Sequence, residues 1–177
     1  HWMVHSFPTR RSSDLGILKL DKGYVSDIVF DKKGNLYAGG YFYGAGNFRS
    51  EGIAKWNGGE WGELSESLDG EIVVFAKDSS GVVYAGGDFR RGDGSVLNFI
   101  AKRDNGVWKA LGSGFNTRVN AIAFSPSGEL YAGGYFKKSG DTMVNGIAKW
   151  DGTKWLALGS GVDGIVYAIA FDKEGTV

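Results

Sequence analysis

The sequence contains no cysteine, and its two histidines, His1 and His5, both lie at the extreme N-terminus. The lack of cysteine excludes disulfide bonds and thiol chemistry. Residues 6–177 have neither His nor Cys, so they cannot supply the usual zinc or copper ligands. A Ser-His-Asp or Cys-His nucleophile is excluded there as well. Only carboxylate, lysine, tyrosine or serine chemistry remains, and we expect no cofactor and no resident metal.

Other features are also missing from the chain. No apolar run approaches the roughly twenty residues that a transmembrane helix needs, so we expect no membrane insertion. Neither a phosphate-binding G-x-x-x-x-G-K-[ST] loop nor an Asp-rich calcium loop is present. Lys and Arg together number 20, as do Asp and Glu, so the formal net charge is zero. Because no stripe of basic residues stands out either, nucleic acid is not expected as the main partner.

What the sequence does contain is a tandem repeat of 47 residues. Tyr37, Tyr84 and Tyr131 lie in three near-identical segments, "LYAGGYF", "VYAGGDF" and "LYAGGYF". The same step separates Ile53, Ile100 and Ile147; Trp61, Trp108 and Trp155; Leu64, Leu111 and Leu158; and Val25, Ile72, Val119 and Val166. One period kept at five places without an insertion indicates a repeat architecture.

Each repeat is predicted to form four short strands. The first, such as "VNAIAF", precedes a turn with Gly in the fourth place, as in "DKKGN", where a residue with positive φ is needed. The second is "LYAGGYF", and a loop of about nine residues leads to the third, "GIAKW". An Asn-Gly or Asp-Gly turn then leads to a fourth strand that begins at Trp. No segment has helical periodicity, so essentially no helix is expected.

The pattern within the first strands predicts how the sheets pack. Large residues (Ile28, Phe75, Ile122 and Ile169) alternate with small ones (Val29, Ala76, Ala123 and Ala170), which suits a sheet covered on both faces. We therefore predict an all-β fold, a β-propeller fragment with about three complete four-stranded blades and partial blades at both ends. The predicted blades are residues 24–66, 71–113 and 118–160, with a partial blade at 165–177. A β-solenoid is the main alternative.

The repeat also resembles known families. "LYAGGYF", "GIAKWDG" and "LGSG" are similar to kelch-like and WD-like propeller repeats, and more closely to the repeats of secreted bacterial surface proteins and of fungal cortical polarity markers. The resemblance covers residues 17–177. The step from Trp150 to Trp155 is shorter than the usual kelch spacing. The resemblance implies a propeller at the cell surface or outside the cell, and it specifies fold far better than function.

The two ends of the chain do not fit the repeat. Residues 6–15, "SFPTRRSSDL", resemble a translated sequencing adaptor, so we interpret residues 1–15 as a non-native tail and residues 16–177 as the propeller fragment. A disordered native tail is the alternative. Val177 aligns with Leu36, so the chain is expected to be a piece of a larger ring. We expect its exposed end blades to favour self-association.

A ligand-binding site is predicted on the loops between the second and third strands. These loops vary while the strands around them repeat, which is typical of a binding face on a rigid scaffold. We expect a protein or glycan ligand there. The candidate residues are Arg49, Arg90, Arg91, Asp93, Lys137, Lys138 and Asp141.

Positions that depart from the repeat form a second set of candidates. Asp27 replaces Val or Ala, Asp88 replaces Tyr, Lys77 replaces Phe, and Arg103 replaces Trp. Asp27 and Asp88 are candidates for a carboxylate pair of the kind that glycoside hydrolysis uses. The sequence thus favours a non-catalytic binding module and keeps a carboxylate-dependent hydrolase or lyase as the alternative. For Asp27 and Asp88 we favour neutral drift, or a local Asp–Lys contact, over the catalytic pair.

Overall fold

The turns between first and second strands are the same in every repeat. In the computed structural model, which describes residues 23–45, 48–62, 64, 68–92 and 94–177, the Asp31 carboxylate accepts hydrogen bonds from the backbone N–H groups of Lys33 and Asn35. Gly34 follows with φ of 80°. Gly81 and Gly128 repeat this conformation at 84° and 86°, which confirms the predicted need for glycine.

The strands form three antiparallel four-stranded sheets, and the described residues contain no helix. Sheet I has the order β1 (Gly23–Phe30), β2 (Leu36–Phe42), β5 (Ile53–Trp56), β6 (Trp61–Gly62). Sheet II consists of β7 (Glu71–Lys77), β8 (Val83–Asp88), β11 (Ile100–Asp104) and β12 (Val107–Ala110). Sheet III consists of β13 (Val119–Phe124), β14 (Leu130–Gly134), β17 (Ile147–Trp150) and β18 (Trp155–Ala157). The all-β prediction and the four strands per repeat are confirmed.

The connections from second to third strands are more ordered than predicted. Each contains a small hairpin instead of an irregular loop: β3 (Gly44–Ala45) with β4 (Phe48–Arg49), β9 (Arg91–Gly92) with β10 (Ser95–Val96), and β15 (Lys138–Ser139) with β16 (Thr142–Met143). Gly94 and Gly140 lie in two of the turns, with φ of 78° and 54°. These glycines allow the tight reversal that pairs the flanking residues.

A β-bulge recurs in every first strand. The register shifts between Val25 and Asp27 in β1, and at the equivalent places in β7 and β13. The second glycine of each Gly-Gly pair lies against the bulged strand. At Gly87, an added Cβ would lie 2.1 Å from the carbonyl oxygen of Glu71, so only glycine fits there.

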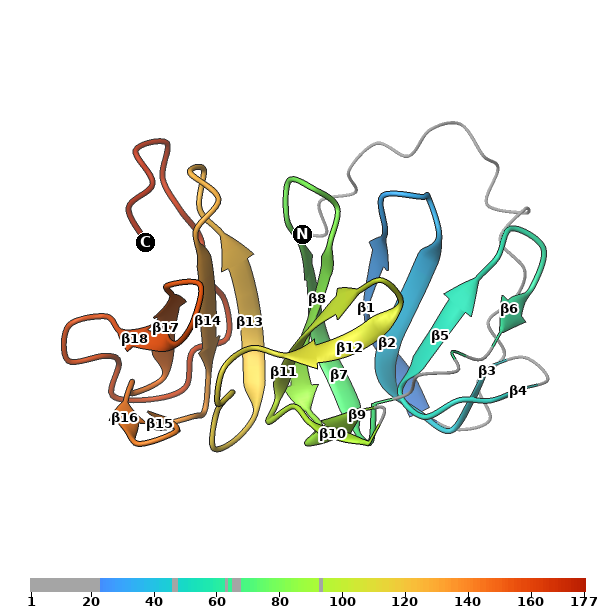
Figure 1. Cartoon of the computed structure of the whole chain (residues 1–177), viewed down its shortest axis with the longest axis horizontal. Coiled ribbons are helices and arrows are strands. Elements are labelled where there is room, and N and C mark those ends of the chain that lie inside the picture. Colours follow the sequence, from blue (N-terminus) through green and yellow to red (C-terminus); the bar gives the residue numbers. More distant parts are fainter. Residues whose placement is uncertain (1–22, 46–47, 63, 65–67, 93) are drawn as a thin grey trace.

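The first glycine of each pair lets the next sheet approach. An added Cβ on Gly39 would lie 2.6 Å from the Phe75 ring, and one on Gly86 would lie 2.7 Å from a methyl group of Val119. Strand β7 accordingly packs on β1 and β2, and β13 packs on β7 and β8. Figure 1 shows the three sheets side by side in an open row, which does not close into a ring.

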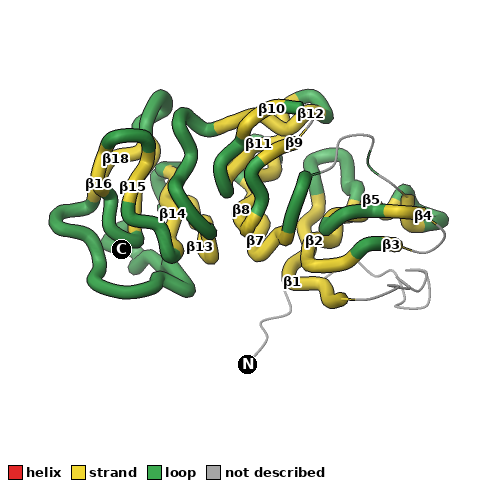
Figure 2. Tube along the Cα trace, turned by 90° about the horizontal axis from the view of Figure 1, so that it is seen from below, coloured by secondary structure: helices red, strands yellow, loops and turns green. Residues whose placement is uncertain are grey.

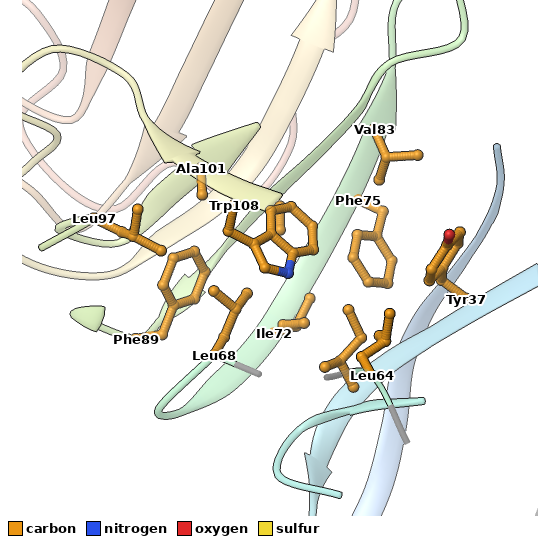
Figure 3. Close-up of a cluster of buried hydrophobic side chains, with 12 residues drawn as sticks. Tyr37, Leu64, Leu68, Ile72, Phe75, Val83, Phe89, Leu97, Ala101 and Trp108 are labelled. Carbon is orange, nitrogen blue, oxygen red and sulfur yellow. The ribbon is translucent and has the colours of Figure 1, made fainter. Parts of the chain in front are cut away.

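The core lies between neighbouring sheets. Figure 3 shows one cluster, in which Tyr37 of sheet I lies beside Phe75 of sheet II, and Ile72 and Trp108 of sheet II continue the cluster. Leu68, from the connection between the two sheets, is fully buried in the same cluster. A second cluster of the same kind joins sheets II and III. Burial between sheets explains why both faces of the predicted first strands are apolar.

The first strands at the two ends of the row differ from those between them. Residues 166–171, expected to form a fourth first strand, are not part of any sheet, because only Val177 of the predicted partner strand follows. Phe171 still packs on Tyr131, with ring centroids 5.0 Å apart. At the other end, Ile28 is 48% exposed because no described sheet covers the outer side of β1. The predicted tail, residues 1–15, lies outside the described residues.

Candidate functional site

One edge of the three sheets collects the variable parts of the chain. The small hairpins β3–β4, β9–β10 and β15–β16 lie along the lower edge in Figure 1, where the first strands begin and the second strands end. Figure 2 views the molecule from this side, with β1, β7 and β13 along one side of the row. We call this edge the hairpin edge.

Side chains from the connections between sheets hold the hairpins in place. Asp69 accepts hydrogen bonds at 2.7 and 2.8 Å from the backbone N–H groups of Arg90 and Arg91. Asn116, 47 residues later, does the same for the N–H groups of Lys137 and Lys138, both at 3.0 Å. These bonds fix the β9–β10 and β15–β16 hairpins on the edge, as a preformed binding surface requires.

The structure brings most of the predicted loop residues to this edge but does not gather them into one site. The side chains of Arg90, Arg91, Lys138 and Asp141 are exposed, and Lys137 is partly buried. They lie in or next to two different hairpins, β9–β10 and β15–β16. Arg49 lies in β4 of the separate β3–β4 hairpin, and Asp93 falls outside the described residues.

A row of three linked side chains crosses the hairpin edge. Tyr24, Glu71 and Arg118 occupy the same position in three successive repeats, at or just before the start of the first strand. The Tyr24 hydroxyl donates to Glu71 Oε1 at 2.9 Å. Arg118 donates from Nη1 to Glu71 Oε2 at 3.0 Å and from Nη2 to Oε1 at 3.3 Å. The Glu71 carboxylate thus joins all three sheets: it accepts a hydrogen bond from Tyr24 of sheet I and forms a two-pronged ion pair with Arg118, at the start of sheet III.

The row is partly buried and continues past Arg118. The Glu71 side chain is only 13% exposed, whereas that of Arg118 is 39% exposed. Arg118 Nε donates to the Asn120 side chain at 3.1 Å, and Asn120 donates to the carbonyl of Val166 at 3.2 Å. The hydrogen bond to Glu71 raises the pKa of Tyr24, with burial adding to the shift, so Tyr24 stays a neutral donor.

Two more exposed tyrosines lie next to Tyr24 of this row. Tyr41 is directly across the sheet from Tyr24, with ring centroids 6.1 Å apart, and Tyr43 lies 5.4 Å from Tyr41. Their exposed fractions are 53% for Tyr24, 45% for Tyr41 and 52% for Tyr43. We call these three residues the tyrosine patch. A hollow of about 150 Å³ adjoins it, lined by Tyr41, Tyr43, Glu51 and Asp69 among others.

A second, wider hollow of about 470 Å³ lies between sheets II and III on the same edge. Arg90 lies 5.4 Å over the ring of Phe99, and both line it. Phe99 has φ of 71°, at a position where the other two repeats have Gly52 and Gly146. A bulky residue in this conformation is strained, and such strain concentrates at functional sites.

The structure does not bring Asp27 and Asp88 together as a catalytic pair. Asp27 accepts hydrogen bonds at 2.7 Å from the N–H of Phe75, on the neighbouring sheet, and at 2.8 Å from that of Ile28. Asp88 is exposed and lies across the sheet from Glu71. Phe75 and Glu71 lie four residues apart along β7, so the two carboxylates lie at different levels of the sheets. Asp27 therefore has the role of a structural acceptor between sheets I and II.

The environment of Asp27 predicts an unusual pH dependence of stability. Burial raises its pKa above the ordinary aspartate value, against the effect of the two N–H bonds. Its contribution to stability is therefore full below the ordinary pKa and is lost as the pH rises through the raised one. We expect wild type to gain stability over Asp27→Asn between pH 7 and pH 4, measured by urea unfolding.

Asp78 provides a matched control of opposite sign. Burial acts to raise its pKa, but hydrogen bonds from Ser80 and Val82 outweigh burial and hold the pKa below the ordinary value. Wild type should therefore lose stability relative to Asp78→Asn as the pH falls. A constant difference between wild type and Asp27→Asn from pH 7 to pH 4 would contradict the buried assignment of Asp27.

Sequence reasoning missed the Tyr24–Glu71–Arg118 row and the strained Phe99. A sequence signal for the Tyr24–Glu71–Arg118 row is nonetheless present in the repeat. Directly before the regular aliphatic residue, the sequence has Tyr, Glu, Arg and Ile in successive repeats. When one position differs this strongly between otherwise similar repeats, its side chain is expected at the surface, where core packing does not restrict the residue type.

Comparisons with known proteins identify a fold and no family. No family model and no curated protein matches the chain. Among solved structures, the chain is similar to two crystal structures described as the extracellular domain of BT4673 from B. thetaiotaomicron, a one component system in one case and a hybrid two component system in the other. The TM-scores are 0.56 and 0.57, at 17% and 16% identity, over 96% and 88% of this chain. The chain spans only about a fifth of the length of each (21% and 20%).

Two further observations concern the described residues. They contain no helix long and apolar enough to cross a membrane. They also contain no group of three or more His, Asp or Glu side chains placed to hold a metal ion.

Proposed function

We propose that the chain is part of an extracellular β-propeller that binds a glycan, without catalysis, at the tyrosine patch of its hairpin edge. The propeller proposal is supported by the 47-residue repeat and by the three four-stranded sheets that pack face to face. An extracellular location is supported by the similar structures, which are extracellular domains. In this proposal each sheet is one blade, and the hairpin edge is one rim of the ring.

The observation that carries the binding proposal is the exposure of Tyr24, Tyr41 and Tyr43 beside carboxylates. A tyrosine combines a flat apolar face with a hydroxyl, so a cluster of exposed tyrosines suits the C–H faces and hydroxyls of a sugar. The two-pronged bond between Glu71 and Arg118 fixes the row beneath the patch. Carboxylates of Glu51 and Asp69, at the adjacent hollow, can accept hydrogen bonds from sugar hydroxyls.

A binding screen with immobilised glycans tests this proposal. The chain is compared with a variant that carries Tyr41→Ala and Tyr43→Ala, and affinities for any glycan bound are then measured by calorimetry. We expect the double variant to bind at least about tenfold more weakly, because aromatic anchors dominate binding energy at such sites. Tyr135→Ala is the matched control, since Tyr135 is 57% exposed at the position of Tyr41 but lies on sheet III.

Three outcomes would contradict the proposal. Equal loss in the double variant and in Tyr135→Ala would show that the patch is not the site. Unchanged affinity in the double variant would also show that the tyrosine patch is not the binding site. Binding to a protein partner, with no glycan retained in the screen, would replace the glycan with the other ligand class that the sequence allows.

A further inference from the structure

The wider hollow on the hairpin edge, between sheets II and III, has no role in the proposed function. The buried rings of Phe99 and Phe115 supply its apolar lining. The rest of its lining consists of Arg90, Asn98, Ser113, Asn116 and Gly140. Among these lining residues the Arg90 guanidinium is the charged group, and none is a carboxylate.

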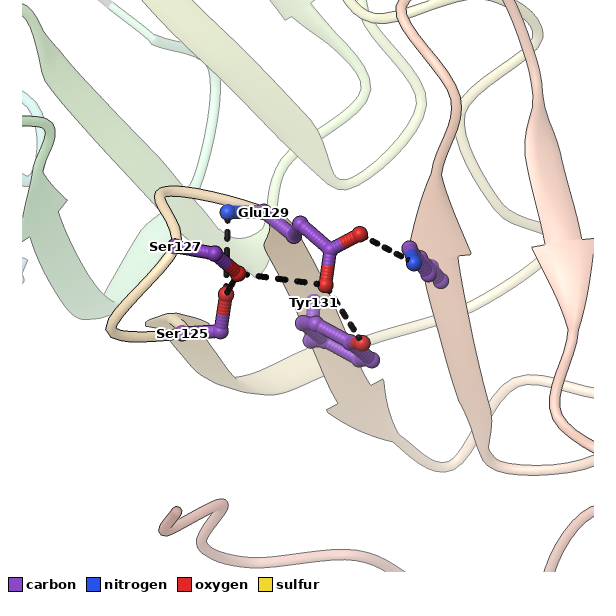
Figure 4. Close-up of polar contacts among 5 residues, drawn as sticks. Ser125, Ser127, Glu129 and Tyr131 are labelled. Atoms are coloured by element: carbon purple, nitrogen blue, oxygen red, sulfur yellow. Dashed lines mark hydrogen bonds and ion pairs between the residues drawn. The ribbon is translucent and has the colours of Figure 1, made fainter. Parts of the chain in front are cut away.

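The Arg90 side chain is exposed and has no carboxylate partner within the described part of the chain. Its guanidinium carbon lies 5.4 Å from the ring centroid of Phe99, a contact that restricts the side chain. By contrast, the Lys149 ammonium on sheet III is paired with Glu129, which also accepts a hydrogen bond from Tyr131 (Figure 4). Arg90 therefore keeps its N–H donors for a ligand.

The Asn116 side chain supplies a second donor at this hollow. Its Oδ1 accepts hydrogen bonds from the backbone N–H groups of Lys137 and Lys138, both at 3.0 Å. These bonds fix the orientation of the amide, because an NH₂ group could not accept them. No described residue accepts a hydrogen bond from the Asn116 Nδ2 group, so this group is left as a donor.

The repeat shows that the amide at Asn116 is a local departure. The equivalent residues, 47 positions away in each direction, are Asp69 and Asp163. Asp69 accepts the N–H groups of Arg90 and Arg91 in the same way, so an aspartate can hold a hairpin equally well. Support of the hairpin therefore does not account for the amide. An aspartate at this position would bring a negative charge to the hollow, whereas asparagine brings a donor.

The strained Phe99 is a second departure in the same hollow. The other two repeats have Gly52 and Gly146 at this position, and glycine adopts a positive φ without strain. The strained residue brings an aromatic ring under the Arg90 guanidinium. Two departures from the repeat thus meet at one hollow, as is common at functional sites.

The carboxylates of the flanking segments lie outside the lining of this hollow. Asp69 holds the backbone of Arg90, but it lines the smaller hollow beside the tyrosine patch. Asp88 ends β8, and Asp141 follows Gly140 in the β15–β16 hairpin. All three aspartates are exposed, so water weakens their repulsion of an anion. The charge preference of the hollow is therefore set mainly by Arg90.

We propose that this hollow binds the oxyanion group of a ligand, with Arg90 as the charged contact and Asn116 and Ser113 as supporting donors. Carboxylate and sulfate groups both present acceptor oxygens that suit such a set of donors. The site is separate from the tyrosine patch and does not rest on the proposed function.

An NMR titration of the full chain with sulfate, glucuronate and uncharged glucose tests this proposal. Ionic strength is held constant with sodium chloride, and the side-chain NH₂ signals of Asn116 are followed. We expect a saturable shift with sulfate, with glucuronate or with both, and none with glucose. The anion that binds more tightly identifies the class of oxyanion.

Variants separate a specific site from general attraction, and their affinities are followed through the backbone N–H signals of Ser113 and Gly140. Asn116→Asp installs the residue of the other repeats and keeps the acceptor for the hairpin, so it should fold. We expect it to weaken anion binding at least about tenfold, and we expect the same of Arg90→Gln.

Asn105→Asp is the matched control. It makes the same chemical change at an exposed residue that does not line the hollow. Asn105 has φ of 52°, a conformation that aspartate also tolerates. Its affinity for the anion should therefore stay within about twofold of wild type.

The proposal is overturned by any of four results. One is the absence of a saturable shift with both anions. Another is binding of glucose as tight as that of glucuronate, which would show that the charge is not recognised. The third is equal weakening by Asn116→Asp and Asn105→Asp, which would indicate non-specific charge. The last is full affinity in Arg90→Gln.

Discussion

Replacing Gly87 with alanine is expected to destabilise the chain by about 3 kcal/mol or more. The added Cβ would lie 2.1 Å from the carbonyl oxygen of Glu71 and 3.0 Å from the Cα of Ile72. Both are backbone atoms in the bulged part of β7, so no side-chain rotation can relieve the clash. A loss of this size is a large fraction of the total stability of a typical domain. Urea unfolding followed by tryptophan fluorescence measures it.

Gly62→Ala is the matched control. Gly62 also lies in a strand, but an added Cβ there meets no heavy atom within 4 Å. The free energy of unfolding of Gly62→Ala should therefore stay within about 0.5 kcal/mol of the wild-type value. Gly87→Ala unfolding at the same urea concentration as Gly62→Ala would show that β7 and β8 can separate freely, against the packing described above.

The Gly-Gly pairs show how far sequence reasoning reaches. The repeated "AGG" indicates close approach of another backbone or sheet, because glycine inside a strand weakens it unless something needs the space. The sequence does not predict which glycine meets which neighbour. That assignment depends on the bulge, which shifts the register by one residue and so changes the face on which a side chain lies.

Prediction of the candidate sites from the sequence is limited in the same way. Variable loops between regular strands correctly place Arg90 and Lys138 on one edge, since loop variability is visible in the sequence. The row of Tyr24, Glu71 and Arg118 was not predictable as a unit, because its members meet only when three sheets pack side by side. Arg103 stood out as a departure from the repeat, but the sequence could not show that it lies against the rings of Tyr37 and Trp108, on two different sheets.

Trp155→Ala is expected to cost about 4 kcal/mol, the other large effect on stability. The Trp155 side chain is 1% exposed, and its ring lies 4.8 Å from Phe115 and 5.2 Å from Trp150. Its indole N–H donates at 3.0 Å to the carbonyl of Leu111, which follows β12 of sheet II. Trp155 thus links sheet III to the chain of sheet II. Trp155→Phe keeps much of the apolar contact but loses this hydrogen bond, so a smaller cost of about 1–2 kcal/mol is expected.

The shape of the unfolding transition shows what this link does. Leu156→Ala, at the adjacent and 38% exposed position, serves as the control and should stay within about 0.5 kcal/mol of wild type. If the sheets unfold as one unit, Trp155→Ala shifts the NMR signal of the Trp108 indole N–H, in sheet II, and the circular dichroism signal of the whole chain to the same lower urea concentration. Loss of sheet III alone, with Trp108 unaffected, would instead mean that each 47-residue unit is stable by itself and that contacts between sheets add little.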